Sequence, residues 1–404
     1  MKYKKLLSVA LLAVLHSAST IASASSPVIY SINVDSYNPR LAKVKIDTST
    51  LPSITMLASR TMRNNRQPEL ICQRGGLPDR RVDFGSSINC DSVVWTLNFQ
   101  KEVIEGVDAS LQNNIYSPAG DWHLLTEWNS LPRIKGMNNV QVCINSDKPQ
   151  CHKLPSISSP PLFMVWGMAE KELNIDDVPV HVMTNQTQLL EQNSTWLPIL
   201  SNQISYIKSV FNVDKMEPWS LVWLKREVSS GSIGGAAGNQ IYIANVATKN
   251  GILISTSYQH LLKISAHESI HFLSSVPAPA WADESLAEYY AIKSLSKTVY
   301  SLPDPIETWQ RMAAKFPHGE TNLYEASRFV TEEQNYEYYG LFYTKGPAFW
   351  AELDKQLHLK GDSLTPYLSE LKTEWKVNLP PQFVDAMIKI IGAKDWVRIE
   401  NKYL

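Results

Sequence analysis

In the first third of the chain, apolar positions alternate with polar ones in several short runs. Residues 28–34 show this period-two pattern, and residues 93–99 and 140–144 repeat it. Such alternation is typical of strands with one buried face, as in antiparallel sheets. Turn-forming clusters, such as Arg-Gly-Gly-Leu-Pro at 74–78, separate the runs. We therefore predict an antiparallel β domain over residues 25–158, and its pattern points to no particular chemistry.

The pattern changes after a proline- and serine-rich segment at 155–161, which we interpret as a linker. Three strand-like runs follow, at 178–183, 219–224 and 240–246. A helical stretch, 200–211, lies between the first two runs, and a glycine-rich loop is expected at 231–238. Mixed strands and helices of this kind predict an α/β domain over residues 162–300.

Helical periodicity dominates the rest of the chain. Two helices are expected at 258–274 and 282–297, and apolar residues then recur every three or four positions to the end. The third part, 301–404, is therefore predicted to be a helical C-terminal region. The expected fold class of the whole chain is α+β.

The overall charge excludes some partners. Acidic and basic residues nearly balance, with a net charge of −1, so no bulk attraction to nucleic acid or to an anionic membrane is expected. Beyond the N-terminus, no apolar run is long enough to cross a bilayer, so stable membrane insertion is not expected either.

The N-terminus has the pattern of a signal peptide. Three lysines stand in the first five residues, an apolar segment covers 6–15, and a small-residue cleavage site, Ala-Ser-Ala, occupies 22–24. We expect residues 1–24 to be removed and the protein to be exported, either to the periplasm or out of the cell. An uncleaved anchor is the alternative.

Four cysteines follow this segment, at Cys72, Cys90, Cys143 and Cys151. An even number of cysteines in an exported chain indicates disulfides, and four cysteines allow three pairings. We favour Cys72 with Cys90 and Cys143 with Cys151, because neighbours in sequence close short loops. The spacings do not match a cysteine zinc site.

The most informative motif is His-Glu-Ser-Ile-His at residues 267–271. Positions i and i+4 of a helix share one face, so His267 and His271 can direct ring nitrogens at one metal ion. Glu268 can then lie beside a water on that metal. Two helical histidines with an adjacent carboxylate are typical of zinc hydrolases.

A catalytic zinc usually has a third protein ligand and an open position. Glu284, in the first turn of the next expected helix, is our candidate ligand. Glu288 shares its face and is the candidate acceptor for the second N–H of a ligand histidine, with Asp283 as the weaker candidate. The competing interpretation of each acid is a solvated helix face.

These motifs together resemble the gluzincin metallopeptidases. The pattern of that family is HExxH followed by W-x-x-E-G-x-A-x-Y, and this chain has HESIH followed by WADESLAEYY at 281–290. Tyr-Thr-Lys-Gly at 343–346 is similar to the YxKG element of the same proteins. Among these proteins the chain resembles the glycyl aminopeptidases that carry a PDZ tail, although we expect no such tail here.

The resemblance implies a thermolysin-like mixed α/β zinc-peptidase domain. It also implies that His267, His271 and Glu284 bind one Zn²⁺ per chain and that Glu268 is the general base. Tyr343 would donate a hydrogen bond to the oxyanion of the tetrahedral intermediate, with Tyr339 as the alternative donor.

Three departures from the family pattern stand out. Ser285 replaces the glycine after the third ligand, and Pro347 follows the YxKG element and predicts a helix start or kink there. The glycine-rich segment carries no glutamate to hold a substrate's free amine, which weighs against aminopeptidase activity.

Two functions remain open at this point. The first is an exported zinc metallopeptidase acting on a peptide or protein, and the missing acid favours an endopeptidase or an unusual exopeptidase. The second is a non-catalytic zinc- or peptide-binding protein on a peptidase scaffold. In either case the run at 240–246 is expected to pair with an extended peptide by strand addition.

Overall fold

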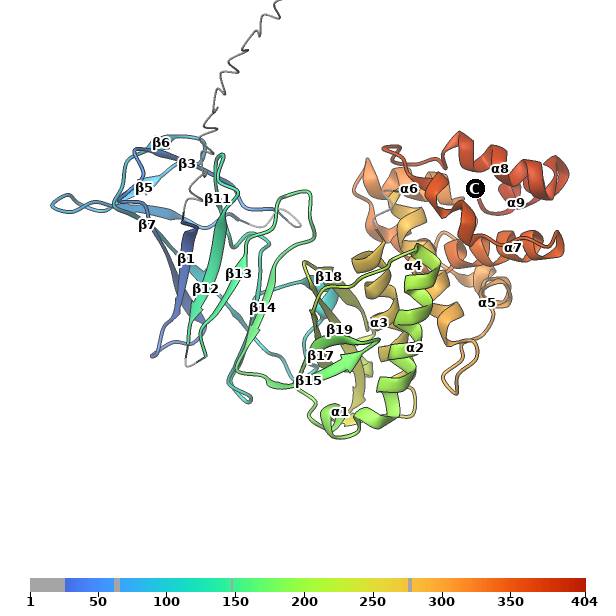
Figure 1. Cartoon of the computed structure of the whole chain (residues 1–404), viewed down its shortest axis with the longest axis horizontal. Coiled ribbons are helices and arrows are strands. Elements are labelled where there is room, and N and C mark those ends of the chain that lie inside the picture. The colour runs from blue at the N-terminus through green and yellow to red at the C-terminus, as the bar shows by residue number, and fades with distance from the viewer. Residues whose placement is uncertain (1–25, 62–65, 147, 275–277) are drawn as a thin grey trace, which may run out of the picture.

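The computed structural model describes residues 26–61, 66–146, 148–274 and 278–404. Sheets fill one end of the molecule, a sheet with helices forms the middle, and helices alone form the other end (Figure 1). This arrangement confirms the α+β class expected from the sequence. The expected signal peptide lies outside the described residues. Within them, no helix is both long enough and apolar enough to cross a bilayer.

The largest sheet of the β domain has seven strands. In spatial order they are β13 (Gln150–Lys153), β12 (Val140–Asn145), β1 (Val28–Val34), β2 (Leu41–Asp47), β7 (Ser92–Asn98), β4 (Leu70–Gln73) and β5 (Arg80–Val82). Neighbouring strands are antiparallel except β1 and β12, which run parallel. Alternate side chains such as Ile32, Val44 and Trp95 are buried, as the period-two pattern predicted.

Two smaller sheets complete the β domain. One contains β14 (Phe163–Trp166), β10 (Trp122–Thr126), β9 (Ile115–Ser117) and β8 (Gln100–Lys101), and the other contains β11 (Arg133–Ile134), β3 (Ile54–Leu57) and β6 (Ser87–Ile88). A short 3-10 turn, η1 (Ala109–Leu111), precedes β9. Strand β14 follows the predicted linker in sequence, yet it pairs with β10.

Both disulfides lie in the β domain. Cys72 pairs with Cys90 and Cys143 with Cys151, at Cα–Cα distances of 5.5 and 4.1 Å. The structure thus confirms the favoured pairing among the three possible ones. Closing loops of this length stabilises a fold by about 2–4 kcal/mol for each bridge, mainly by restricting the unfolded chain.

The central sheet carries the connections expected of an α/β domain. Its strands, in spatial order, are β15 (Ala169–Ile175), β16 (Val178–Thr184), β17 (Trp219–Glu227), β19 (Ile241–Lys249) and β18 (Gly235–Gly238), with β20 (Ile252–Leu253) also paired to β19. Strands β16, β17 and β19 run parallel, and the outer strands run antiparallel to their neighbours.

Both faces of the central sheet are covered. Helices α2 (Asn193–Phe211) and α3 (Ser257–Leu273) pack on one face (Figure 1). On the other face, Val222 and Ile243 share a core with Leu124 of the β domain. This double cover explains why β19 is almost continuously apolar in sequence, as buried parallel strands usually are.

Two expectations about this sheet are wrong. The segment 231–238 was expected to be a loop, but its second half is strand β18. The run at 240–246 was expected to pair with an extended peptide, but β19 is already paired on both sides, with β17 and with β18. Glycine and alanine are poor strand formers, so sequence propensity concealed the extra strand. Among the described residues, β18 forms this edge of the sheet.

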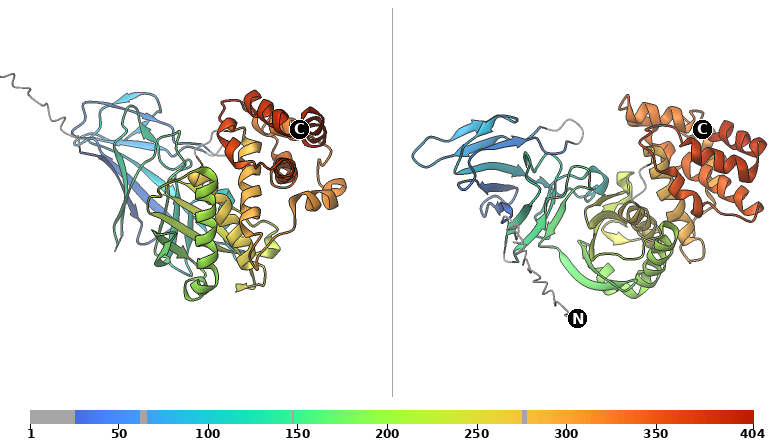
Figure 2. Two further views of the ribbon diagram at one scale, coloured as in Figure 1. Left: turned by 45° about the vertical axis from the view of Figure 1, so that its right-hand side comes forward. Right: turned by 45° about the horizontal axis from the view of Figure 1, so that its top comes forward.

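The remaining helices are two short ones between strands of the central sheet and those that follow α3 to the end of the chain. They are α1 (Gln188–Glu191), η2 (Val228–Ser230), α4 (Ala280–Leu295), α5 (Pro305–Met312), η3 (Ala313–Lys315), α6 (Leu323–Thr331), η4 (Tyr336–Tyr343), α7 (Lys345–Leu359), η5 (Thr365–Leu371), α8 (Pro381–Ile391) and α9 (Ala393–Tyr403). Figure 2 shows the C-terminal helices gathered beyond the central sheet, on the side away from the β domain.

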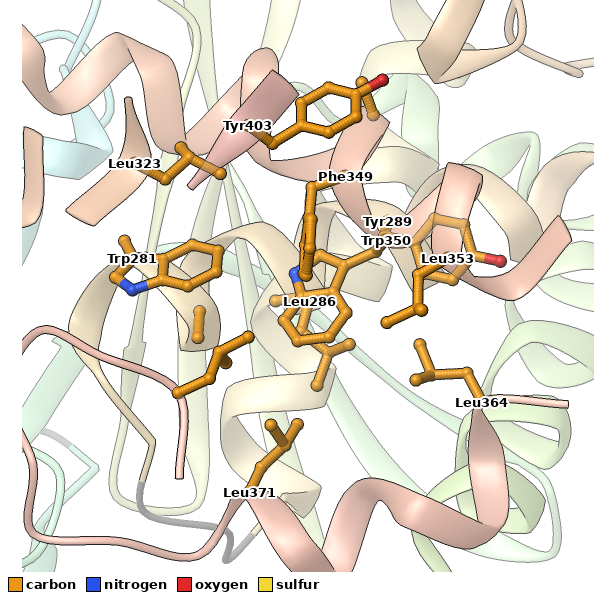
Figure 3. Close-up of a cluster of buried hydrophobic side chains, with 14 of the residues drawn as sticks. Trp281, Leu286, Tyr289, Leu323, Phe349, Trp350, Leu353, Leu364, Leu371 and Tyr403 are labelled. Atoms are coloured by element: carbon orange, nitrogen blue, oxygen red, sulfur yellow. The ribbon is translucent and has the colours of Figure 1, made fainter. Parts of the chain in front are cut away.

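A large aromatic core joins these helices (Figure 3). Trp281 of α4 stacks against Trp350 of α7, with ring centroids 6.0 Å apart, and Phe349 lies edge-on to both. All three side chains are fully buried. Burying an aromatic side chain stabilises a fold by about 2–3 kcal/mol, so this core fixes α4 firmly against the C-terminal helices.

Candidate metal centre

Helix α3 supplies the first two candidate ligands. His267 and His271 stand one turn apart, and their Nε2 atoms lie 3.1 Å from each other. The helix is wedged between the central sheet and α4, and His267 is buried with only 5 % of its surface exposed. Both rings are therefore held in place by packing, with their Nε2 atoms directed at the same point.

Helix α4 brings Glu284 to that point. Its Oε2 atom lies 3.3 Å from Nε2 of His267 and 3.4 Å from Nε2 of His271. Nitrogen and oxygen ligands about 2.0–2.2 Å from a tetrahedral zinc ion lie about 3.3–3.6 Å apart. Two imidazoles and one carboxylate are also a donor set that zinc prefers. The three residues therefore fit a zinc ion with one open position.

Besides Glu284, a further carboxylate lies next to the Nδ1 atom of each histidine. Nδ1 of His267 lies 3.2 Å from Oε2 of Glu288, and Nδ1 of His271 lies 3.2 Å from Oδ2 of Asp283. Carboxylates in these places accept the Nδ1–H bond and so keep Nε2 free to bind metal. From the sequence, Asp283 was the weaker candidate for this role. In the structure, Asp283 and Glu288 lie at the same distance from the Nδ1 atoms that they contact.

Glu288 is held ionised by its neighbours. Burial raises the pKa of a carboxyl group, but the positive charge of Lys263, 2.6 Å away, and the hydrogen bond from His267 outweigh it and lower the pKa of Glu288 to about 2. For His267, burial favours the neutral ring, but the hydrogen bonds to Glu284 and Glu288 outweigh it and raise its pKa to about 9.

Glu268 is the carboxylate beside the three ligands. It is only 6 % exposed, and burial raises its pKa. Strand β18 runs very close to it: a Cβ atom added to Gly235 would meet Oε1 of Glu268 at 2.6 Å and the Ile243 carbonyl at 2.9 Å. Glycine is thus needed at 235, so that the sheet edge and the carboxylate can share one wall of the cleft.

Two tyrosines from η4 contact the candidate ligand Glu284. The hydroxyl of Tyr343 donates to Oε2 of Glu284 at 2.7 Å, and that of Tyr339 donates to Oε1 at 3.0 Å. The Tyr343 ring also stacks on His267, with ring centroids 5.5 Å apart. Burial and the negative charge of Glu284 raise the pKa of both phenols, so both stay protonated and able to donate.

The structure explains the departures at Ser285 and Pro347. Helices α4 and α7 meet at Gly346, where an added Cβ atom would lie 2.3 Å from Cβ of Ser285. The Ser285 hydroxyl accepts a hydrogen bond from Trp350 Nε1 at 2.7 Å, so a serine is accommodated here. Pro347 lies in the first turn of α7, where its missing N–H costs nothing, as the predicted helix start requires.

The cleft has a further wall that the sequence pattern did not reveal. It has a volume of about 720 Å³, and four β-domain residues line it opposite the ligands: Thr61, Ser110, Gln112 and Trp128. We call these four residues the β-domain wall. They come from three separate connections of the β domain, after β3, at η1 and after β10, so no sequence pattern groups them.

A buried asparagine ties this wall to the central sheet. Asn245 of β19 is fully buried, and its Nδ2 donates to the carbonyls of Val107 at 2.7 Å and Leu224 at 3.2 Å. Its Oδ1 accepts from the backbone N–H groups of Ala109 at 3.2 Å and Gly234 at 3.3 Å. One side chain thus joins the turn that bears Ser110 and Gln112 to the strands beside the metal centre.

Comparison of the sequence with family models finds no match, and comparison with curated proteins finds none either. Among solved structures, the chain is similar to the crystal structure of an aminopeptidase N family protein from Idiomarina loihiensis. The TM-score is 0.61 over 93 % of this chain and 76 % of that chain, at 11 % sequence identity. At this identity the likeness establishes the fold alone, which is an aminopeptidase-like scaffold.

Proposed function

We propose that the protein is an exported zinc metallopeptidase that hydrolyses peptide bonds in a peptide or protein substrate. One observation carries the proposal: the candidate ligand atoms of His267, His271 and Glu284 lie 3.1–3.4 Å apart, and Glu268 lines the same cleft. The aminopeptidase-like scaffold supports it. The two disulfides and the signal-like N-terminus support export to the periplasm or out of the cell.

His267, His271 and Glu284 would hold one zinc ion per chain. When bound, zinc supplies a Lewis acid for the substrate carbonyl and lowers the pKa of a water to about 7. Glu268 accepts a proton from the attacking water and passes it to the leaving amine, for which its raised pKa suits it. Tyr343, or Tyr339 beside it, donates a hydrogen bond to the negative charge that develops on the carbonyl oxygen.

Strand β18 is the surface on which we expect the substrate backbone to pair. It is the sheet edge nearest the metal centre, and Gly235, Ala236 and Ala237 line the cleft. Small side chains leave the strand's backbone groups accessible to an extended peptide, which can add as a further strand.

The distribution of acids favours cleavage inside a chain over removal of its first residue. The carboxylates that line the cleft are Glu268, Asp283 and Glu284, and each belongs to the metal centre or to a ligand histidine. None of the three is free to pair with a substrate's terminal ammonium group. We therefore expect acetylation of a substrate's N-terminus to leave its cleavage unchanged.

Metal analysis and one substitution test the proposal. We expect about one zinc per chain and cleavage within a library of N-acetylated peptides. Glu268→Gln should keep the zinc and lose cleavage by about 10²-fold or more, because the proton acceptor is gone. Zinc without cleavage in the wild-type protein would instead favour a non-catalytic zinc- or peptide-binding role, and unchanged cleavage in the variant would remove Glu268 from the mechanism.

A further inference from the structure

A second hollow of about 610 Å³ opens on the β domain, and it adjoins the metal cleft. Gln112 and Trp128 line both hollows, so the two share one ridge. We call the second hollow the β-domain groove. Its lining includes Lys43, Thr96, Asn98, Gln100, Asn113 and Asn114.

The ridge between the two hollows is rigidly built. Nε1 of Trp128 donates to Oε1 of Gln112 at 2.5 Å, and the Thr126 hydroxyl donates to the Gln112 carbonyl at 2.7 Å. The guanidinium of Arg60 lies 5.9 Å from the centre of the Trp128 ring, and it pairs with the buried Glu127. These contacts hold Gln112 and Trp128 against each other and against the buried Glu127 side of the β domain.

Half of the residues that line the groove beyond the ridge carry an amide or a hydroxyl, and the charged residues among the rest are of both signs, Lys43, Arg66 and Glu69. Asn114 is fixed in place, because its Oδ1 accepts from the Thr126 N–H at 2.8 Å and its Nδ2 donates to the Ser130 hydroxyl at 2.8 Å. Thr96 and Asn98 stand exposed on β7, on the outer face of the large sheet. Such groups donate and accept hydrogen bonds without requiring a particular charge, which suits the repeating amides of an extended polypeptide.

We propose that the β-domain groove is an exosite for the substrate's own chain, so that the protein prefers long extended polypeptides to short peptides. This inference rests on the proposed peptidase function, and continuity carries it: a polypeptide leaving the metal cleft over Gln112 and Trp128 enters the groove directly. Because Asn245 fixes the turn that bears Gln112, the two hollows keep a constant spacing, and a substrate can occupy both at once.

Two N-acetylated peptides with the same cleavage site test the exosite. One has about 6 residues and spans about 20 Å when extended, and the other has about 20 residues and spans about 66 Å. We expect kcat/KM for the long peptide to exceed that for the short one by about tenfold or more. The long peptide should be rich in Ser, Thr, Asn and Gln.

Thr96→Trp should fill the groove without touching the metal centre. We expect it to lower kcat/KM for the long peptide by about tenfold and to leave the short peptide within about twofold. Ile29→Trp is the matched control: Ile29 is exposed on β1, on the same outer face of the sheet, and does not line the groove. Should Thr96→Trp fail to fold, Asn98→Trp replaces it.

A binding measurement separates failure of the exosite from failure of the proposed function. In the Glu268→Gln background, Thr96→Trp should weaken binding of the fluorescein-labelled long peptide about tenfold by anisotropy, and Ile29→Trp should not. Equal kcat/KM for both peptides and no effect of Thr96→Trp would overturn the exosite and leave the peptidase standing. Zinc-loaded wild-type protein that binds the long peptide in the groove but cleaves neither peptide would overturn the peptidase alone.

Discussion

The candidate metal centre and the β-domain wall line one cleft, but they are built from contacts of different range. His267 and Glu284 are 17 positions apart in sequence, and His267 and Glu288 are 21 apart. Asn245 and Ala109, whose hydrogen bond fixes the wall, are 136 apart. Helix geometry and one short connection are enough to assemble the centre, whereas the wall exists only when two distant parts of the chain have folded together.

The two regions also differ in the kind of polar group that they bury. The centre gathers buried carboxylates and imidazoles, which are costly without a metal ion or a charged partner. The wall uses a neutral amide, and both polar atoms of Asn245 are hydrogen bonded. We infer that the centre is organised for chemistry at some cost in stability, and that the wall contributes stability and position.

Removing one of the three candidate zinc ligands should have the largest effect, on both zinc content and cleavage. We expect His271→Ala to reduce zinc from about one per chain to near none and to abolish cleavage, because a catalytic zinc needs its three protein ligands. His260→Ala is the matched control on the same helix, since His260 does not line the cleft. Zinc content measured by mass spectrometry checks this, and full zinc in His271→Ala would break the assignment of the centre.

Breaking the link between the β-domain wall and the central sheet should have the second-largest effect. Asn245→Leu removes four hydrogen bonds from the Asn245 side chain to backbone groups of Val107, Ala109, Leu224 and Gly234, which should cost about 3 kcal/mol of unfolding free energy. Lys249→Ala, exposed on the same strand, is the control. Denaturant unfolding of both variants measures the difference. An unchanged transition in Asn245→Leu would show that the wall is not held by this residue.

Substituting the carboxylates that contact Nδ1 of the two histidines should weaken zinc binding to different degrees. We expect Glu288→Gln to weaken zinc binding by about 10–100-fold, because His267 loses the charged acceptor that orients it. Asp283→Asn should do the same to a smaller degree, since the Asp283 side chain is 41 % exposed and that of Glu288 is 6 % exposed. Competition with a coloured chelator measures both affinities. The reverse order would contradict the idea that burial sets the strength of each pair.

The smallest effect that we expect is on stability: although Glu268→Gln should abolish most of the cleavage, it should stabilise the metal-free fold slightly. Burial raises the pKa of Glu268 in the folded state, so its ionised form destabilises the fold above that pKa. Glu268→Gln should therefore stabilise the metal-free protein at pH 7–8 by about 1 kcal/mol. The gain should vanish as the pH falls below about 4, where the carboxyl group becomes protonated in the unfolded as well as in the folded state. Thermal unfolding at both pH values checks this, and a loss of stability at pH 7 would reverse our account of the centre.

Local patterns in the sequence predicted a large part of this protein. The period-two runs predicted β1, β7 and β12, and the four-residue spacing of His267 and His271 placed both on one helix face. The cysteine pairs also followed from short spacing. In each case the deciding interaction lies within a strand, a helix or a short loop, so residues close together in sequence determine its geometry.

Only the tertiary structure decided the rest. It turned Gly235–Gly238 into an edge strand, placed β19 inside the sheet, ran β1 parallel to β12, and brought Gln112 and Trp128 to the metal cleft. These outcomes depend on which surfaces meet after the elements form, and pairing between remote segments leaves no periodic signal in either of them. The residues of one helix pair therefore predict the chemistry that we propose for this protein, while the shape of the site around them is set by contacts across the whole fold.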